Sequence, residues 1–107
     1  MARYLLQAAY TPEAWAAQVK NPQNRVEAIR PAVEGFGGKI VDAYYTFGEY
    51  DIAVLIDMPD NVAAAAFAIS AAAGGAVKAV RTTPLMTVDE GLSAVRKAGQ
   101  SAYRPPS

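Results

Sequence analysis

The amino-acid sequence predicts an α+β domain in which four strands and two helical regions alternate, with one further helix near the C-terminal end. Three observations support this prediction. Four short segments have the periodicity of strands, and capping residues or glycines separate them from helical segments. The chain has 107 residues, enough for one domain with a core of modest size. Hydrophobic residues make up 52% of the chain and charged residues 19%, more apolar side chain than so small a domain can bury alone, so we expect self-association.

The first part of the chain predicts a strand and then a helix with a break. Residues 3–10 form the first predicted strand. The Thr-Pro-Glu sequence at residues 11–13 is typical of a helix start, with a hydroxyl N-cap, a proline in the first turn and an acid near the positive end of the helix dipole. An Asn-Pro pair at residues 21–22 predicts a break and a second helical piece over residues 22–35, in which Pro31 predicts a kink.

The rest of the chain predicts a hairpin and then alternating elements. Residues 39–47 and 50–57 form two strands that a tight reversal at Gly48 and Glu49 joins. The later predicted elements are an alanine-rich helix over residues 61–73, a strand over residues 76–83 that Pro84 limits, and a helix over residues 88–98 that a capping box at Thr87 and Glu90 opens.

The third predicted strand is apolar on both of its faces. Ile52, Val54 and Ile56 point to one side, and Ala53 and Leu55 to the other. The element order matches the ferredoxin-like βαββαβ pattern, in which both helices cover the same face of an antiparallel sheet. Because the opposite face is then bare, we expect a second copy of the chain to cover it in a homodimer or higher homo-oligomer. The alanine-rich helix lacks a polar face, so we also expect it to be buried on several sides through close packing or oligomer contacts.

Composition excludes several classes of site. The chain has no cysteine and no histidine, which excludes disulfides, thiolate nucleophiles, Cys/His zinc sites, histidine-ligated haem and Ser-His-Asp triads. Ten basic residues balance ten acidic residues, so nucleic acid is not an expected partner. No run of carboxylates suggests a metal, and we expect no cofactor. The longest apolar stretch, residues 62–73, is shorter than the ~20 residues that span a bilayer, so we expect a cytoplasmic protein without membrane partners.

The hairpin carries the candidate catalytic residues, Tyr50 and Asp51. They form a hydrogen-bonding pair at a pocket mouth in one interpretation, with Asp51 as a general base. In the other, Gly48 supplies a positive-φ turn position, Asp51 accepts from backbone donors and Tyr50 packs. A carboxylate beside an apolar strand needs a partner, and Arg81 is the candidate. The predicted ligand-binding set is therefore Tyr45, Tyr50, Asp51 and Arg81.

Tyrosines gather in the same part of the sequence. Because neighbouring strand positions face opposite ways, Tyr44 and Tyr45 cannot line the same pocket. On the helix side such rings are core residues, and on the open side they are interface or ligand contacts. The aromatic cluster comprises Tyr44, Tyr45, Phe47 and Tyr50, which Tyr4 and Tyr10 could join.

Gly48, Tyr50 and Asp51, with the cap at residues 11–13 and the glycine pair before the second strand, make the chain resemble the GYD-domain family. The resemblance covers roughly residues 2–97. We therefore expect a domain over residues 1–99 and a flexible or partner-docking tail over residues 100–107. The resemblance implies a dimeric α+β barrel, in which two ferredoxin-like sheets pack face to face.

Function is predicted only in outline. We expect a small homo-oligomeric binding or regulatory module for a small apolar or aromatic molecule, at the sheet–helix interface or between subunits. One alternative is a cofactor-independent enzyme, isomerase- or monooxygenase-like by analogy of fold, that uses Asp51 or Tyr50. A second alternative is a structural assembly subunit.

Overall fold

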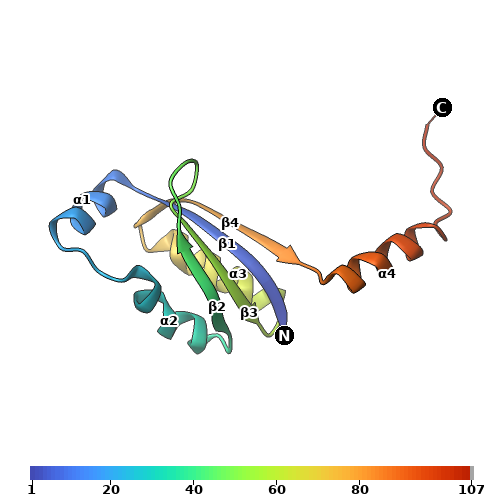
Figure 1. The fold of residues 1–107 in the computed structure, drawn as a ribbon, viewed down its shortest axis with the longest axis horizontal. Helices are drawn as coiled ribbons and strands as arrows, with labels where there is room; N and C mark the ends of the chain where they lie inside the picture. Colours follow the sequence, from blue (N-terminus) through green and yellow to red (C-terminus); the bar gives the residue numbers. More distant parts are fainter. Residues whose placement is uncertain (107) are drawn as a thin grey trace.

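The computed structural model describes residues 1–106, which form one antiparallel sheet with helices packed on it and projecting from its ends (Figure 1). The sheet has four strands in the order β2-β3-β1-β4, and every neighbouring pair is antiparallel. This is the ferredoxin-like arrangement, so the predicted α+β fold is confirmed. The elements in chain order are β1 (Ala2–Tyr10), α1 (Pro12–Lys20), α2 (Arg25–Gly35), β2 (Lys39–Tyr45), β3 (Ile52–Met58), α3 (Asn61–Ala73), β4 (Val77–Leu85) and α4 (Val88–Ala98).

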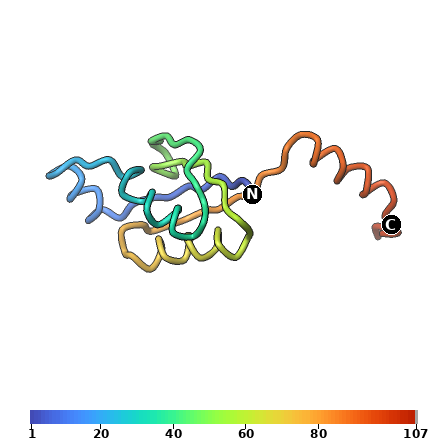
Figure 2. Tube along the Cα trace, turned by 90° about the horizontal axis from the view of Figure 1, so that it is seen from below, coloured from blue at the N-terminus to red at the C-terminus, as the bar shows by residue number. Residues whose placement is uncertain are grey.

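The core lies between the sheet and helices α2 and α3, and Figure 2 shows α3 running beneath the strands. The face of β3 that carries Ile52, Val54 and Ile56 is fully buried, as the alternation predicts. Helix α2 adds Val33 to this core, and α3 adds Phe67 together with Ala64. The opposite face of the sheet, with Ala53 and Leu55, is only half-buried.

The predicted break in the first helical region is confirmed. Helix α1 ends at Lys20, and α2 begins at Arg25, three residues later than predicted. The start of α2 is set by Asn24, whose Oδ1 accepts a hydrogen bond from the Glu27 N–H at 3.1 Å. Helix α2 includes Pro31 within a single continuous helical span.

The hairpin is wider than the predicted reversal at Gly48 and Glu49. Strand β2 ends at Tyr45 and β3 begins at Ile52, so a loop of residues 46–51 joins them. Thr46 closes this loop twice: its N–H donates to the Asp51 carbonyl at 2.8 Å, and its hydroxyl donates to the Tyr50 carbonyl at 2.7 Å. Both contacts lie at the base of the loop, next to the last ladder pair, Tyr45 and Ile52.

Strand β4 continues through Pro84, where the sequence predicted its end. Pro84 is opposite Tyr4 of β1, and β4 is the edge strand of the sheet. Because an edge strand pairs on one side only, a proline whose missing N–H faces outward breaks no ladder bond.

One ion pair joins β1 to β3 on the open face of the sheet. The Arg3 guanidinium donates to both carboxylate oxygens of Asp57, with distances of 2.9 Å from Nε and 3.2 Å from Nη2. These hydrogen bonds hold the pKa of Asp57 below its ordinary value. The carboxylate is itself buried at the end of β3, so the pair satisfies a charge that would otherwise be costly.

Within the described residues, the alanine-rich helix α3 buries one side only. Ala64 and Phe67 are its buried residues, whereas Val62 is 78% exposed and Ile69 is 67% exposed. Both lie on the outer side of the helix. The prediction that oligomer contacts cover this surface stays a prediction.

Helices α1 and α4 project from opposite ends of the sheet, as both views show (Figures 1 and 2). Neither helix contains a buried residue, and the molecule is 57 × 34 × 22 Å in extent. The predicted capping box of α4 is present, because the Thr87 and Glu90 side chains each accept from the other residue's N–H. Residues 100–106 of the predicted tail contain no helix or strand, and residue 107 lies outside the described residues.

Within residues 1–106, no helix is long and apolar enough to cross a membrane. The same part of the chain contains no group of three or more acidic side chains placed to hold a metal ion.

A candidate binding pocket beside helix α1

A cavity of about 590 Å³ lies where α1 and the start of α2 meet the ends of strands β1 and β2. This volume falls within the range of pockets that hold small ligands, roughly 300–1,000 Å³. Its lining combines three aromatic rings, three small alanines, three amides and two cations. These are Tyr10, Trp15 and Tyr45; Ala14, Ala17 and Ala76; Gln18, Asn21 and Gln23; and Lys20 and Arg25.

The cap at the start of α1 places the indole in this cavity. The Thr11 hydroxyl accepts from the Ala14 N–H at 3.1 Å, and the Thr11 N–H donates to the Ala76 carbonyl at 3.0 Å. The first contact starts the helix and the second ties it to the beginning of β4. Trp15 lies in the first turn, so it is held over the end of the sheet.

The loop between α1 and α2 forms the far wall of the cavity. Gln18 fixes this loop by a reciprocal contact: its Nε2 donates to the Gln23 carbonyl at 2.5 Å, and its Oε1 accepts from the Gln23 N–H at 3.2 Å. The Asn21 N–H donates to the Ala17 carbonyl at 2.9 Å and ends α1. The Asn-Pro break therefore places Asn21 and Gln23 in the wall of the cavity.

Two of the aromatic rings contact each other edge to face. The centroids of Tyr10 and Trp15 are 5.5 Å apart, with an angle of 88° between the ring planes. Burial raises the pKa of the Tyr10 phenol above its ordinary value; the nearby Tyr45 phenol adds to this rise, and the Arg25 guanidinium opposes it. The Tyr45 hydroxyl in turn accepts from the Arg25 N–H at 3.4 Å. The two phenols and Arg25 thus form one group inside the cavity.

Asp51 supports the cavity from behind. One of its carboxylate oxygens, Oδ2, accepts from the Tyr10 N–H at 2.8 Å and from the Trp15 indole N–H at 3.2 Å. Its own N–H donates to the Ala8 carbonyl at 2.8 Å. The hairpin, the end of β1 and α1 are therefore joined at this residue, and the orientation of the Trp15 ring depends on it.

The structure separates the sequence-predicted site residues. Tyr45 lines the cavity, on the helix side of the sheet. Tyr50 and Asp51 lie in the hairpin loop next to the cavity without lining it. Asp51 contacts one lining residue, because its carboxylate accepts a hydrogen bond from the Trp15 indole N–H. Arg81 lies opposite Gln7, midway along the edge strand β4.

The predicted pairing of Asp51 with Arg81 does not occur in the described part of the chain. The hydrogen bonds of the Asp51 carboxylate come from Tyr10 and Trp15 instead. The reason is topological: β3 and β4 pair with opposite sides of β1, so a whole strand lies between them.

The predicted split between neighbouring tyrosines is confirmed. Tyr44 is opposite Ala53 on the open face and donates its hydroxyl proton to Asp42 at 2.8 Å, whereas Tyr45 is opposite Ile52 on the helix side. Phe47, at the tip of the loop, is fully exposed.

Sequence reasoning missed Trp15, Arg25 and Gln18 as site residues. Each comes from the helical region between β1 and β2, which the sequence showed only as a broken helix. The one available signal was the combination of a strong cap before Trp15 and an Asn-Pro corner after it, since a short helix between two such stops must turn back toward the sheet.

Comparison with known proteins agrees with the resemblance at the hairpin. The GYD domain family model matches residues 4–95, which includes most of β1, the other three strands and the whole of the cavity lining. No curated protein matches the chain. Since the family match covers well over half of the sequence, the chain belongs to the GYD domain family.

Proposed function

We propose that this protein is a small homo-oligomeric binding or regulatory module, and that it takes a small apolar or aromatic molecule into the cavity beside α1. The observation that carries the proposal is a cavity of about 590 Å³ walled by Tyr10, Trp15 and Tyr45. Flat aromatic walls with a few polar groups are the usual composition of small-molecule sites.

The lining suits a planar ligand in particular. Alanines leave room between the rings, because their side chains occupy little volume, and Tyr10 and Trp15 offer a preformed edge-to-face pair. The indole is fixed by Asp51 and the loop wall by Gln18, so a ligand need not order these groups when it binds. Preorganisation of this kind strengthens binding by reducing the entropy lost on association.

The homo-oligomer in this proposal is formed by the open face of the sheet. Leu5 and Leu55 lie opposite each other at the centre of this face, with Ala53 beside them, and all are half-buried by their own sheet only. A second copy placed face to face, as in a dimeric α+β barrel, would remove this apolar surface from water.

The binding role is favoured over the enzymatic alternative by the contacts of Asp51. Its carboxylate accepts two hydrogen bonds that hold other residues in place, and Tyr50 and Asp51 do not line the cavity. A general base must reach the proton that it removes from the ligand. The Asp51 carboxylate instead holds Tyr10 and Trp15 of the cavity wall in place.

The chain contains a single tryptophan, which makes the cavity directly observable. We expect the neutral probe N-phenyl-1-naphthylamine to quench or shift Trp15 fluorescence as it binds. Ala17→Phe places a ring inside the cavity and should weaken this binding by about tenfold or more, as expected when a site is filled. Ala16→Phe is the matched control, because Ala16 is an exposed neighbour on α1 that does not line the cavity. Equal binding to the two variants would overturn the proposal.

A further inference from the structure

We infer that the ligand of the α1 cavity is an organic anion, with an aromatic or apolar body and a carboxylate-type acidic group that Arg25 binds. The inference rests on the proposed function and names the chemical class of the ligand. It starts from the charges of the lining: two cationic residues, Lys20 and Arg25, and no acidic residue line the cavity. An apolar site with charge of only one sign favours a ligand of the opposite sign.

Arg25 is the more important of the two cations because its surroundings are the more apolar. It is half-buried, whereas Lys20 is exposed. Its guanidinium lies close enough to the Tyr10 phenol to affect its ionisation, and its backbone N–H donates to the Tyr45 hydroxyl. The Tyr10 phenol is neutral, so it does not cancel the charge of the guanidinium. A partly desolvated charge without a counter-ion is unfavourable, and an incoming anion would relieve this.

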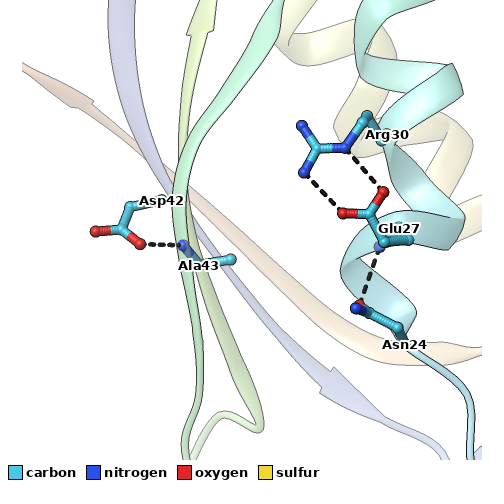
Figure 3. Close-up of polar contacts among 5 residues, drawn as sticks. All are labelled: Asn24, Glu27, Arg30, Asp42 and Ala43. Atoms are coloured by element: carbon cyan, nitrogen blue, oxygen red, sulfur yellow. Dashed lines mark hydrogen bonds and ion pairs between the residues drawn. The ribbon is translucent and has the colours of Figure 1, made fainter.

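No carboxylate within residues 1–106 neutralises Arg25. The ion pairs in that part of the chain join Arg3 to Asp57 and Arg30 to Glu27. Glu27, the nearest acid along the chain, is engaged by Arg30 through contacts of 2.9 and 3.1 Å on the outside of α2 (Figure 3). Asp51 accepts from Tyr10 and Trp15 at the back of the cavity.

The geometry also suggests how such a ligand is oriented. Tyr10, Trp15 and Tyr45 contribute the aromatic walls, and Arg25 lies beside two of them. A planar ring held between these walls brings an attached carboxylate toward the guanidinium, whose fork matches two carboxylate oxygens. The side-chain amide of Gln18 already bonds the backbone of Gln23, and side-chain amides carry no charge, which leaves Arg25 as the half-buried group that selects for charge.

Two isosteric probes test this selection: 1-naphthoate and its neutral counterpart 1-naphthamide, each titrated against Trp15 fluorescence and by calorimetry. We expect the acid to bind about tenfold more tightly, because a charge-assisted hydrogen bond is roughly twice as strong as a neutral one. High salt should weaken the binding of 1-naphthoate and leave the binding of 1-naphthamide unchanged. The salt comparison needs no variant, so it holds even if a substitution disturbs folding.

Arg25→Gln should remove the preference for the acid while changing amide binding by about twofold or less. Arg25→Lys keeps the charge without the fork, so we expect it to keep only part of the preference. Arg96→Gln is the matched control, because Arg96 is an exposed arginine on α4 that does not line the cavity. Equal affinities for the two probes in the unmodified protein, or a preference that survives in Arg25→Gln, would overturn the inference. If neither probe binds, both the inference and the proposed function fail. If the amide binds and the acid does not, only the inference fails and the proposed function stands.

Discussion

At the scale of single residues, Asp51 contacts two residues of the candidate site although it does not line the cavity itself. Its Oδ2 atom holds the backbone of Tyr10 and the indole of Trp15, two groups that belong to different elements. The hydrogen bond to Trp15 is partly exposed, whereas the bond to Tyr10 closes the end of the sheet. Removing this carboxylate should therefore act on stability through Tyr10 and on the cavity through Trp15.

We predict that Asp51→Ala lowers the free energy of unfolding by about 1–3 kcal/mol, because the Tyr10 N–H is left without its acceptor. Trp15 should also become mobile, which lowers its fluorescence anisotropy and weakens binding of the naphthalene probes. Urea unfolding and steady-state anisotropy measure the two effects. Asp89→Ala, an exposed acid on α4, is the control. Unchanged anisotropy in Asp51→Ala would show that the indole does not depend on this contact.

The sequence predicted the location of Asp51 and, as one alternative, its role as an acceptor of backbone hydrogen bonds. It could not predict the partners. Trp15 and Asp51 are separated by 36 positions in the chain, so their contact depends on how α1 is placed over the sheet. The same limitation explains the wrong partner proposed for Asp51: the choice of Arg81 required the strand order, which places β1 between them.

At the scale of elements, local chemistry explains what was predictable. The capping box of α4 involves residues three positions apart, Thr87 and Glu90, and it is present as the sequence indicates. The helix break before α2 also depends on adjacent residues. In contrast, the contact of Trp15 with Asp51 joins residues 36 positions apart, and burial of α3 depends on what packs outside it. The sequence is informative where partners are near in the chain and uninformative where they are distant.

Helix α4 provides a test of how a helix can be stable without packing on the rest of the domain. We call the sheet together with helices α2 and α3 the body of the molecule. We predict that Thr87→Ala lowers the helical content of the protein and leaves the urea midpoint of the body unchanged. The N-cap contributes about 1 kcal/mol to its helix, but α4 contains no buried residue and so is not coupled to the core. Far-ultraviolet circular dichroism and Tyr or Trp fluorescence follow the two parts separately.

The pH dependence of the same cap has a definite sign. Hydrogen bonds from Thr87 lower the pKa of Glu90 below its ordinary value, so the cap is strongest above that ordinary value. It is lost as the pH falls through the lowered pKa, and the helical signal should fall with it. Glu90→Gln cannot ionise and should flatten this acid response, whereas Thr87→Ala keeps the backbone N–H that contributes most to the lowered pKa. A shift of the urea midpoint of the body in Thr87→Ala would show instead that α4 packs on the body, in the same or in a second copy.

At the scale of the whole molecule, the excess of apolar residues remains on the surface. Three apolar surfaces face outward: the half-buried sheet face around Leu55, the outer side of α3 around Ile69, and the α4 side chains Val88, Leu92 and Val95. The last three fall at i, i+4 and i+7, so they form a single stripe along the helix. A body that contains its own closed core and still exposes these surfaces is consistent with the self-association that composition predicts.

The open sheet face is the surface on which the proposed homo-oligomer depends, and one substitution tests it. Leu55→Arg places a charge at the centre of this face, opposite Leu5, where a partner sheet would have to bury it without a counter-ion. We expect light scattering to show the mass of an oligomer for the unmodified protein and of a monomer for this variant. Ile69→Arg adds the same charge on the other side of the molecule, outside α3, and should leave the oligomer intact. If Ile69→Arg alone gives a monomer, the subunits meet through α3 and the face-to-face arrangement is wrong. If the unmodified protein is a monomer at micromolar concentration, the sheet face is solvated. The cavity beside α1 then has to act within a single subunit.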